Sequence, residues 1–258
     1  MRLPCALSIA GSDPTGAAGL QADLRTFAAL KVQGLGAVAA VTAQNSRRVI
    51  ATQPVAANML RDQLNALAED FPIAAIKIGL LASASNIAVV AAFLGAGGLH
   101  NIVLDPVLVS SSGTVLLPAK AQRALIDLLP QMDIVTPNRP EAAALLGRPL
   151  PAKRAARALL DLGARAVLLK GGHARGTTVV DYFADGNGVR DIRHPRLPFD
   201  ARGTGCVLSS AIAAYLARGY AMGAAVDSAE QFLQRALRRS RRAGHSAKHF
   251  LLLNSDNE

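Results

Sequence analysis

Short apolar runs alternate with longer segments of mixed polarity along the whole chain. Several of the short runs are rich in Val and Ile, and most end at Gly, Pro, Asp or Asn, which is typical of buried β-strands. The pattern therefore predicts strands at Cys5–Ala10, Gly36–Thr42, Ala74–Ile78, Asn101–Asp105, Asp133–Thr136, Ala166–Lys170 and Val179–Ala184.

The longer segments place their apolar residues at helical spacing. They predict helices at Gly19–Leu30, Val55–Glu69, Ala84–Leu94, Lys120–Leu129, Glu141–Leu146, Lys153–Leu162, Gly205–Arg218 and Met222–Arg242. A repeated strand-then-helix order implies right-handed crossovers and parallel strands. We expect one three-layer α/β/α domain over residues 1–258, with a mostly parallel central sheet, because no linker or repeat marks a boundary.

Composition narrows the function classes. Lys and Arg number 28 against 18 Asp and Glu, a net charge of +10, but much of the excess is a run of arginines near the C-terminus with no aromatic residues among them. With no Trp and 4% aromatic residues, the chain does not have the base-stacking platforms of nucleic-acid binders. We therefore expect a solvated helix face there, with an anionic small substrate as the second interpretation.

Cysteine content and apolar run length bear on the cellular setting. Two cysteines cannot form a disulfide framework, which favours a reducing, cytoplasmic location. The longest purely apolar stretch, Ile87–Leu99, has 13 residues, whereas a membrane span needs about 20. Residues 3–10 could pass for a short signal-peptide core, but a buried first strand is the favoured interpretation because an amphipathic helix follows.

The strongest chemical motif is Gly203-Thr204-Gly205-Cys206, directly before an apolar helical pattern. Glycines on both sides of Thr204 allow a tight turn with exposed N–H groups, and the helix start adds its own unpaired N–H groups and positive dipole end. The motif predicts an anion cradle for a transferring phosphoryl group. Cys206 is the candidate general base, with a pKa lowered by the helix field. The alternative is a glycine-rich helix start with a small buried cysteine.

Other polar residues follow predicted strands, where ligands of parallel sheets bind. Asn138 and Glu141 are three residues apart and could hold Mg²⁺ through its waters, or could simply cap a helix. Asp105 ends a buried strand, so it is either a site residue near a cation or part of an Asp-Pro turn. Lys170 precedes two glycines and could contact a polyphosphate, and His173 is as consistent with a loop residue as with a functional one.

The first strand and the second strand also end in candidate binding residues. Gly11 opens a glycine-rich turn that fits neither the dinucleotide-binding nor the P-loop motif, although close approach to a ligand is plausible. Gln44 ends the second strand, where its amide can pair with the edge of a heterocycle or bond its own backbone. Cys5, within the first strand, is expected to be a core residue.

Taken in order, these motifs closely resemble the hydroxymethylpyrimidine and phosphomethylpyrimidine kinases of thiamine biosynthesis, within the ribokinase-like superfamily. They extend from residue 5 to about residue 218, and eight motifs in one order are specific although each alone is weak. The motifs are Ala10–Gly16, Gly19–Leu24, Thr42–Asn45, Lys77–Gly79, Asp105–Val107, Thr136–Asn138 with Glu141, Lys170–His173 and Gly203–Cys206.

The resemblance implies a ribokinase-like fold and an enzyme that uses ATP and Mg²⁺ to phosphorylate 4-amino-5-hydroxymethyl-2-methylpyrimidine, and then its monophosphate. It also implies a cytoplasmic homodimer acting on small molecules. The roles it implies are Gln44, Gly11, Asp23 and Val107 for the pyrimidine, Cys206 as base, Gly203, Thr204, Gly205 and Cys206 as anion hole, Asp105 and Lys170 for the nucleotide, and Asn138 and Glu141 for Mg²⁺.

The chain departs from the family pattern at several positions. Ala201-Arg202 stands where the family has Thr-His, and Arg202 is expected either to add a cation near the nucleotide phosphates or to point to solvent. Ala17 replaces a loop glycine, Leu80 replaces a common Met, and the usual glycine-rich C-terminal segment is absent. Two alternatives stay open: a pyridoxal kinase of the same superfamily, and a non-catalytic pyrimidine-binding protein built on the kinase fold.

Overall fold

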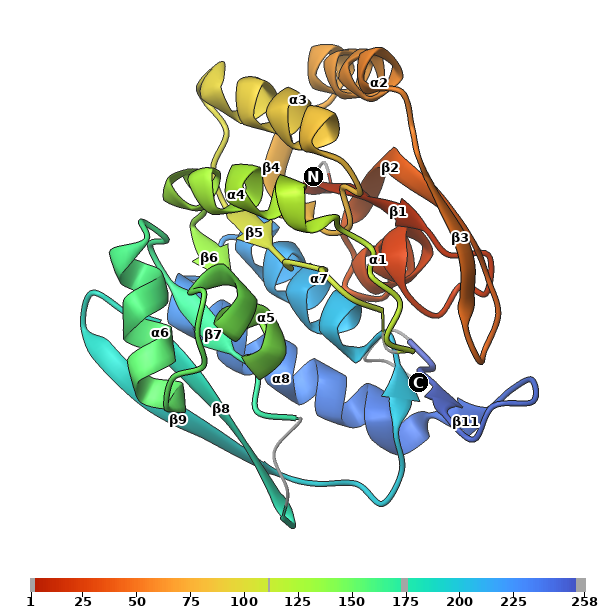
Figure 1. Ribbon diagram of the computed structural model, residues 1–258, viewed down its shortest axis with the longest axis vertical. Helices are drawn as coiled ribbons and strands as arrows, with labels where there is room; N and C mark the ends of the chain where they lie inside the picture. The colour runs from red at the N-terminus through yellow and green to blue at the C-terminus, as the bar shows by residue number, and fades with distance from the viewer. Residues whose placement is uncertain (1–2, 111, 173–175, 254–258) are drawn as a thin grey trace.

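A long, mostly parallel sheet forms the middle of the molecule (Figure 1). The computed structural model describes residues 3–110, 112–172 and 176–253. Among them, the strand order is β3-β2-β1-β4-β5-β6-β7-β8-β9. Strands β2, β1, β4, β5, β6 and β7 pair in parallel, whereas β3, β8 and β9 pair antiparallel to their neighbours. The bounds are β1 (Cys5–Ser12), β2 (Gln33–Gln44), β3 (Val49–Pro54), β4 (Ile73–Ile78), β5 (Ile102–Leu104), β6 (Ile134–Val135), β7 (Val167–Leu169), β8 (Thr178–Asp185) and β9 (Gly188–Pro195).

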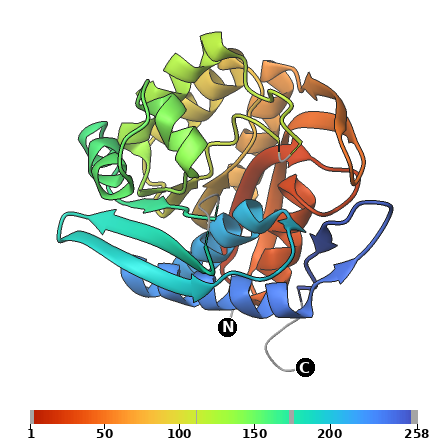
Figure 2. The same cartoon turned by 60° about the horizontal axis from the view of Figure 1, so that its bottom comes forward.

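Helices cover both faces of this sheet, so the predicted three layers are confirmed (Figure 2). One face carries α2 (Ala57–Asp70), α3 (Ala84–Gly95), α4 (Ala119–Asp127), α5 (Arg139–Leu145) and α6 (Ala152–Asp161), with the short 3₁₀ helix η1 (Leu129–Gln131). The other face carries α1 (Gly19–Ala29), α7 (Thr204–Ala217) and α8 (Met222–Arg239). None of the helices in the described part of the chain is long and apolar enough to cross a lipid bilayer.

The alternation of side chains along β1 explains how this strand packs against the helices on both faces of the sheet. Leu7 and Ile9 pack in the core beneath α2, α3 and α4, whereas Ala6 belongs to the core beneath α1, α7 and α8. Successive strand residues point to opposite faces, so a fully buried central strand must be apolar on both sides. Helix α7 is buried over Val207–Leu216, which explains why its sequence is apolar all round.

The structure adds elements that the hydrophobic pattern did not predict. Strands β3 and β9 were missed because both carry several polar side chains, and they lie at the two edges of the sheet. A second small sheet joins β10 (Ala201–Arg202), β12 (His249–Phe250) and β11 (Arg241–Arg242). The helix predicted to reach Arg242 therefore ends at Arg239, because Arg241 and Arg242 pair with β12 instead.

The sheet order creates a crevice at the carboxyl ends of β1 and β4. The chain leaves β1 to form β2 on one side and later returns to form β4 on the other side. Helical crossovers on opposite sides of such a point leave a gap between the loops, and α/β proteins bind their ligands there.

Candidate active site

A cavity of about 1080 Å³ lies at this crevice. Of the residues predicted for the site, all but Asp23 line its wall: Gly11, Gln44, Asp105, Val107, Asn138, Glu141, Lys170, Arg202, Gly203, Thr204, Gly205 and Cys206. Its volume is at the upper end of the range for small-molecule sites, so it has room for two ligands side by side.

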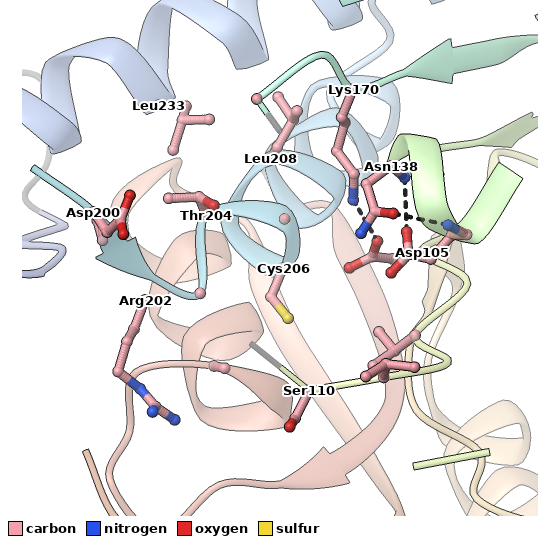
Figure 3. Close-up of a pocket in the computed structure, with 18 of the residues that line it drawn as sticks. Asp105, Ser110, Asn138, Lys170, Asp200, Arg202, Thr204, Cys206, Leu208 and Leu233 are labelled. Carbon is pink, nitrogen blue, oxygen red and sulfur yellow. Dashed lines mark hydrogen bonds and ion pairs between the residues drawn. The ribbon is translucent and has the colours of Figure 1, made fainter. Parts of the chain in front are cut away.

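The anion loop is formed by the turn between β10 and α7 (Figure 3). Gly203 is the N-cap of α7 and has a left-handed backbone with φ of 73°. The N–H groups of Thr204, Gly205 and Cys206 then belong to the first helical turn, where the α-helix supplies no acceptor for them. All three residues line the cavity, so their N–H groups are candidates for an anion hole, and the Cys206 side chain also lines it.

Gly203 is required for steric as well as conformational reasons. A Cβ added there would overlap the carbonyl oxygen of Ala17 in the first loop. We expect Gly203→Ala to lower the free energy of unfolding by about 1–3 kcal/mol, because a non-glycine residue is strained at this φ and the loop must move. Denaturant unfolding measures this change. Gly95→Ala, at a helix end with open space around it, is the matched control and should stay close to wild type; equal losses in both variants would contradict the argument.

One end of the cavity carries a compact group of charges. Lys170 Nζ lies 2.8 Å from Asp105 Oδ1, and Asp105 is 2% exposed. Burial by itself would lower the pKa of Lys170, but the carboxylates of Asp105 and Glu141 outweigh it and raise the pKa. Lys170 therefore stays a cation. Asp105 is a buried carboxylate paired with this cation, as the sequence predicted for a carboxylate at the end of a buried strand.

Asn138 and Glu141 form a complete capping box at the start of α5. Asn138 Oδ1 accepts from the Glu141 N–H at 2.9 Å, and Glu141 Oε2 accepts from the Asn138 N–H at 2.7 Å. The capping interpretation is thus confirmed for both residues. Burial raises the pKa of Glu141 to about 7, opposed by Lys170 and reinforced by Asp105. A second cation beside Lys170 would relieve this crowding of carboxylates.

Asp23 corrects one prediction, because it lies behind the cavity wall rather than in it. Its carboxylate is fully buried on α1 and accepts from Lys77 Nζ at 2.7 Å, from Ser8 Oγ at 2.6 Å and from Ser210 Oγ at 2.6 Å. Asp23 therefore positions Lys77, which does line the cavity. The sequence could have pointed to Lys77, because it is a lysine in the middle of an apolar strand, and a buried charge must have a partner.

The protonation of Cys206 also differs from the prediction. Burial raises the pKa of its thiol to about 11, Asp105 and Asp23 add to the rise, and Lys77 opposes it. The expected lowering of this pKa is therefore wrong for the ligand-free protein. The reason is that burial of the sulfur disfavours the thiolate and two carboxylates from other elements, Asp105 and Asp23, repel it, and together they outweigh the Lys77 cation.

This pKa predicts how Cys206 reacts with alkylating agents. Below a pKa of about 11, the thiolate fraction rises about tenfold per pH unit. We expect the rate of inactivation by iodoacetamide to climb steadily from about pH 7 to about pH 10. The measurement is residual activity against time in a Cys5→Ala background, which leaves Cys206 as the cysteine that reacts. A rate that levels off near neutral pH would instead show a lowered pKa.

Arg202 corrects a second prediction. Its guanidinium does not join Lys170 and Asp105 but points away from them, as Figure 3 shows. It is 6% exposed, its Nη2 donates to Gln44 Oε1 at 3.1 Å, and its Nη1 donates to Ser46 O at 3.2 Å. Gln44 Nε2 in turn donates to Thr42 Oγ1 at 3.0 Å. Arg202 therefore belongs to the end of the cavity that holds Gln44, and it neither meets the nucleotide end nor points to solvent.

Two further residues complete the comparison with the sequence predictions. His173 lies outside the described residues. Asp13, which the sequence did not single out, is 1% exposed and accepts from the N–H groups of Thr15 and Ala18 at 2.8 and 3.0 Å. It holds the first glycine-rich loop closed beside Gly203, and its Oδ2 lies 3.9 Å from Arg202 Nη2.

Solved structures share this architecture. The ADP complex of pyridoxal kinase from Bacillus subtilis matches with a TM-score of 0.91 at 29% identity, over 98% of each chain. Phosphomethylpyrimidine kinase from Clostridium difficile 630 matches with a TM-score of 0.81 at 37% identity, over 92% of this chain and 100% of that one. Together, the fold and the cavity define an ATP-dependent phosphotransferase with a ribokinase-like fold.

Sequence relatives narrow the class further. The family described as phosphomethylpyrimidine kinase matches residues 13–250. The hydroxymethylpyrimidine/phosphomethylpyrimidine kinase of Rhizobium meliloti is 44% identical over 237 residues, which cover 88% of both chains. The chain belongs to the phosphomethylpyrimidine kinase family, as its motifs predicted. It also matches 48% of the thiamine biosynthesis bifunctional protein ThiED of Geobacter sulfurreducens, at 40% identity.

Proposed function

We propose that this chain phosphorylates the hydroxymethyl group of 4-amino-5-hydroxymethyl-2-methylpyrimidine with ATP, and then phosphorylates the resulting monophosphate, as the names of its relatives indicate for them. The observation that carries the proposal is one continuous cavity with two unlike ends. Lys170, held in place by Asp105, offers a positive charge to a triphosphate, and the anion loop offers N–H groups. At the other end, Gln44 offers an amide to a heterocycle.

The proposed reaction follows from these positions. The substrate hydroxyl oxygen forms a bond to the γ-phosphorus while the bond to the bridging oxygen breaks and ADP leaves. The N–H groups of the Gly203–Cys206 turn stabilise the negative charge on the transferred group. The Cys206 sulfur, in its thiolate form, accepts the hydroxyl proton. Lys170 remains charged throughout and attracts the phosphates.

Mg²⁺ fits the oxygen-rich end of the cavity. Glu141 and Asn138 present a buried carboxylate and an amide oxygen, and burial and the nearby Asp105 carboxylate raise the pKa of Glu141 although Lys170 opposes them. When bound, Mg²⁺ would neutralise charge on the ATP phosphates. The capping box fixes both side chains in place for this role without using every lone pair of their oxygens.

A pyridoxal kinase is the second candidate, because solved pyridoxal kinases match the fold with TM-scores of 0.90 and 0.91. An assay that couples ADP release to absorbance should offer the pyrimidine alcohol, its monophosphate and pyridoxal separately. The proposal expects the highest kcat/KM with the pyrimidine alcohol and clear turnover of its monophosphate. A preference for pyridoxal would reverse the assignment, and pyrimidine binding without ADP release would indicate a non-catalytic binding protein.

Arg202 gives a test that separates the two ends of the cavity. We expect Arg202→Met to raise the KM for the pyrimidine alcohol about tenfold or more and to leave the KM for ATP nearly unchanged, because a charged hydrogen bond that orients Gln44 is lost. Steady-state kinetics with each substrate varied in turn measures both constants. Arg202→Lys keeps the charge and should be intermediate. A rise confined to the KM for ATP would contradict this assignment and indicate that Arg202 acts at the nucleotide end of the cavity.

Several features support the remaining expectations. Helices from both halves of the chain pack on one sheet, which supports a single domain over residues 1–258. The proposed base role needs the Cys206 thiol, which lines the cavity, to stay reduced, and this supports a cytoplasmic location. Exposed apolar side chains on successive elements at the β3 edge, Val41, Ile50 and Met59, support a homodimer. Light scattering coupled to gel filtration tests the dimer.

A further inference from the structure

Asp181, His194 and Glu230 bring their polar atoms together between β8, β9 and α8. The ligand atoms of the three side chains all lie within 4.8 Å of one another. His194 Nε2 lies 3.1 Å from Asp181 Oδ2 and 3.9 Å from Glu230 Oε2. Asp181 and His194 also line the cavity, so the cluster is reachable from the solvent that fills it.

Glu230 is the member of the cluster that its protein environment leaves unsatisfied. It is 4% exposed, and no donor group among the residues that the structure describes reaches either of its carboxyl oxygens. Asp181, by contrast, accepts from the Gly171 N–H as well as facing His194. Burial and the facing Asp181 carboxylate raise the pKa of Glu230 well above its usual value. The cluster therefore holds two acidic side chains close together in a buried place, where a bound cation would be favourable.

The hydrogen bonds of His194 do not supply a donor to the Glu230 carboxyl group. With a proton on Nε2, the ring donates to Asp181, and its Nδ1 accepts from Gln234 Nε2 at 3.0 Å. That arrangement satisfies the ring and Asp181 but sends no donor to Glu230. If the Gln234 amide turns over, its oxygen accepts from Nδ1–H and the Nε2 lone pair is free to bind a metal, a common outer contact of metal-bound histidines.

We propose that Asp181, His194 and Glu230 form a binding site for a divalent transition-metal ion of the Zn²⁺ type. One imidazole nitrogen and two carboxylate oxygens are a ligand set that suits Zn²⁺, Mn²⁺ or Co²⁺ rather than Mg²⁺. Ligand atoms around Zn²⁺ lie roughly 3.4 Å apart, so Asp181 and His194 are already close to this spacing and the flexible Glu230 side chain must move inward.

This site is separate from the place proposed for Mg²⁺. Its ligands come from the antiparallel hairpin β8–β9 and from α8, whereas Asn138 and Glu141 come from the start of α5. A bound ion would join the hairpin to α8 and hold His194 directly before residues 195–200, which continue along the cavity wall into β10. We therefore expect metal binding to stabilise the fold.

The test is a titration of the full chain, stripped with a chelator, with Zn²⁺ and separately with Co²⁺, in excess Mg²⁺. We expect one tightly bound Zn²⁺ per chain and a higher Tm with metal than without. Glu230→Gln and His194→Gln should each weaken binding at least tenfold and lose the metal-dependent rise in Tm. Glu230→Gln replaces an unpartnered carboxylate by an uncharged side chain of the same shape, so we expect it to fold at least as well as the metal-free wild type.

Two controls decide whether the metal sits at this cluster. Asp227→Asn removes an exposed carboxylate from the same helix and should bind as wild type does. Bound Co²⁺ should show the weak visible bands of nitrogen and oxygen ligands, without the strong charge-transfer band of a thiolate. The proposal is overturned by absence of binding to the wild type, by unchanged binding in both cluster variants, or by a thiolate band, which would place the metal on a cysteine.

Discussion

The Cys206→Ala variant is expected to bind both substrates with little change and to lose about 10²–10⁴ in kcat. Its sulfur lies in the first turn of α7, beside the N–H groups that would hold the transferred phosphoryl group. No other thiol in the described part of the chain lines the cavity, because Cys5 is buried within β1. Alanine removes the proton acceptor without adding bulk, so binding and folding should survive.

Calorimetry for binding and steady-state kinetics for turnover separate these two effects. Cys5→Ala is the matched control, because it removes a thiol from the core and should leave kcat unchanged. If Cys206→Ala retains the wild-type kcat, the thiol is not the base, and Asp105 becomes the next candidate because its carboxylate lines the same cavity. The anion hole would still contribute, since one of its donors alone is typically worth about 10²–10³ in rate.

The Lys77→Met variant is expected to lose about 3–5 kcal/mol of unfolding free energy, the usual effect of breaking a buried ion pair from one side. Lys77 and Asp23 are both fully buried, and their charged atoms lie 2.7 Å apart. Without Lys77, the Asp23 carboxylate keeps two serine hydroxyls but has no cation. Burial alone would lower the pKa of Lys77, yet Asp23, Cys206 and Asp105 raise it, which shows how strongly the site favours the cation.

Urea unfolding measures the loss, and a double-mutant cycle identifies its cause. Asp23→Asn in the Lys77→Met background removes the stranded charge, so the double variant should be more stable than Lys77→Met alone. An exposed pair offers the comparison: Arg61→Met, which breaks the contact with Asp62 at the surface, should leave stability nearly unchanged. A Lys77→Met variant as stable as wild type would show that this pair contributes no net stability.

Much of the fold could be predicted from hydrophobic periodicity. The parallel strands and the helices stand out because each buries an apolar face or is buried on both sides, and burial leaves a period in the sequence. Strands β3 and β9 and the β10–β12–β11 sheet lack that period, since they lie at an edge or are very short and are not buried on an apolar face. β3, β9 and β11 pair with the strand next to them in the chain, whereas β10 pairs with β12 from a distant segment, which a local window of sequence does not show.

The residues of the site were found for a similar reason. Asp105 and Lys170 follow parallel strands and Gln44 ends another, and parallel strands deliver their carboxyl ends to one edge. Gly203–Cys206 follows β10 of the small sheet and was found from its glycine-rich motif before an apolar helix. The sequence by itself therefore determined the three layers, the family and twelve of the residues that line the cavity. It did so because the alternation of strands with helices along the chain and the local motifs both leave short-range patterns in the sequence, whereas the order of the strands in the sheet came from the structure.

Tertiary structure alone decided where the charged groups point and what they meet. Asp23 turns inward to Lys77, Arg202 turns to Gln44 rather than to the phosphate end, and Glu230 is buried close to Asp181 and His194. It also decided that the Cys206 thiol has a raised pKa, through burial and two carboxylates from other elements. Such outcomes depend on desolvation and on charges brought together from segments far apart in the chain, which no local pattern of residues records.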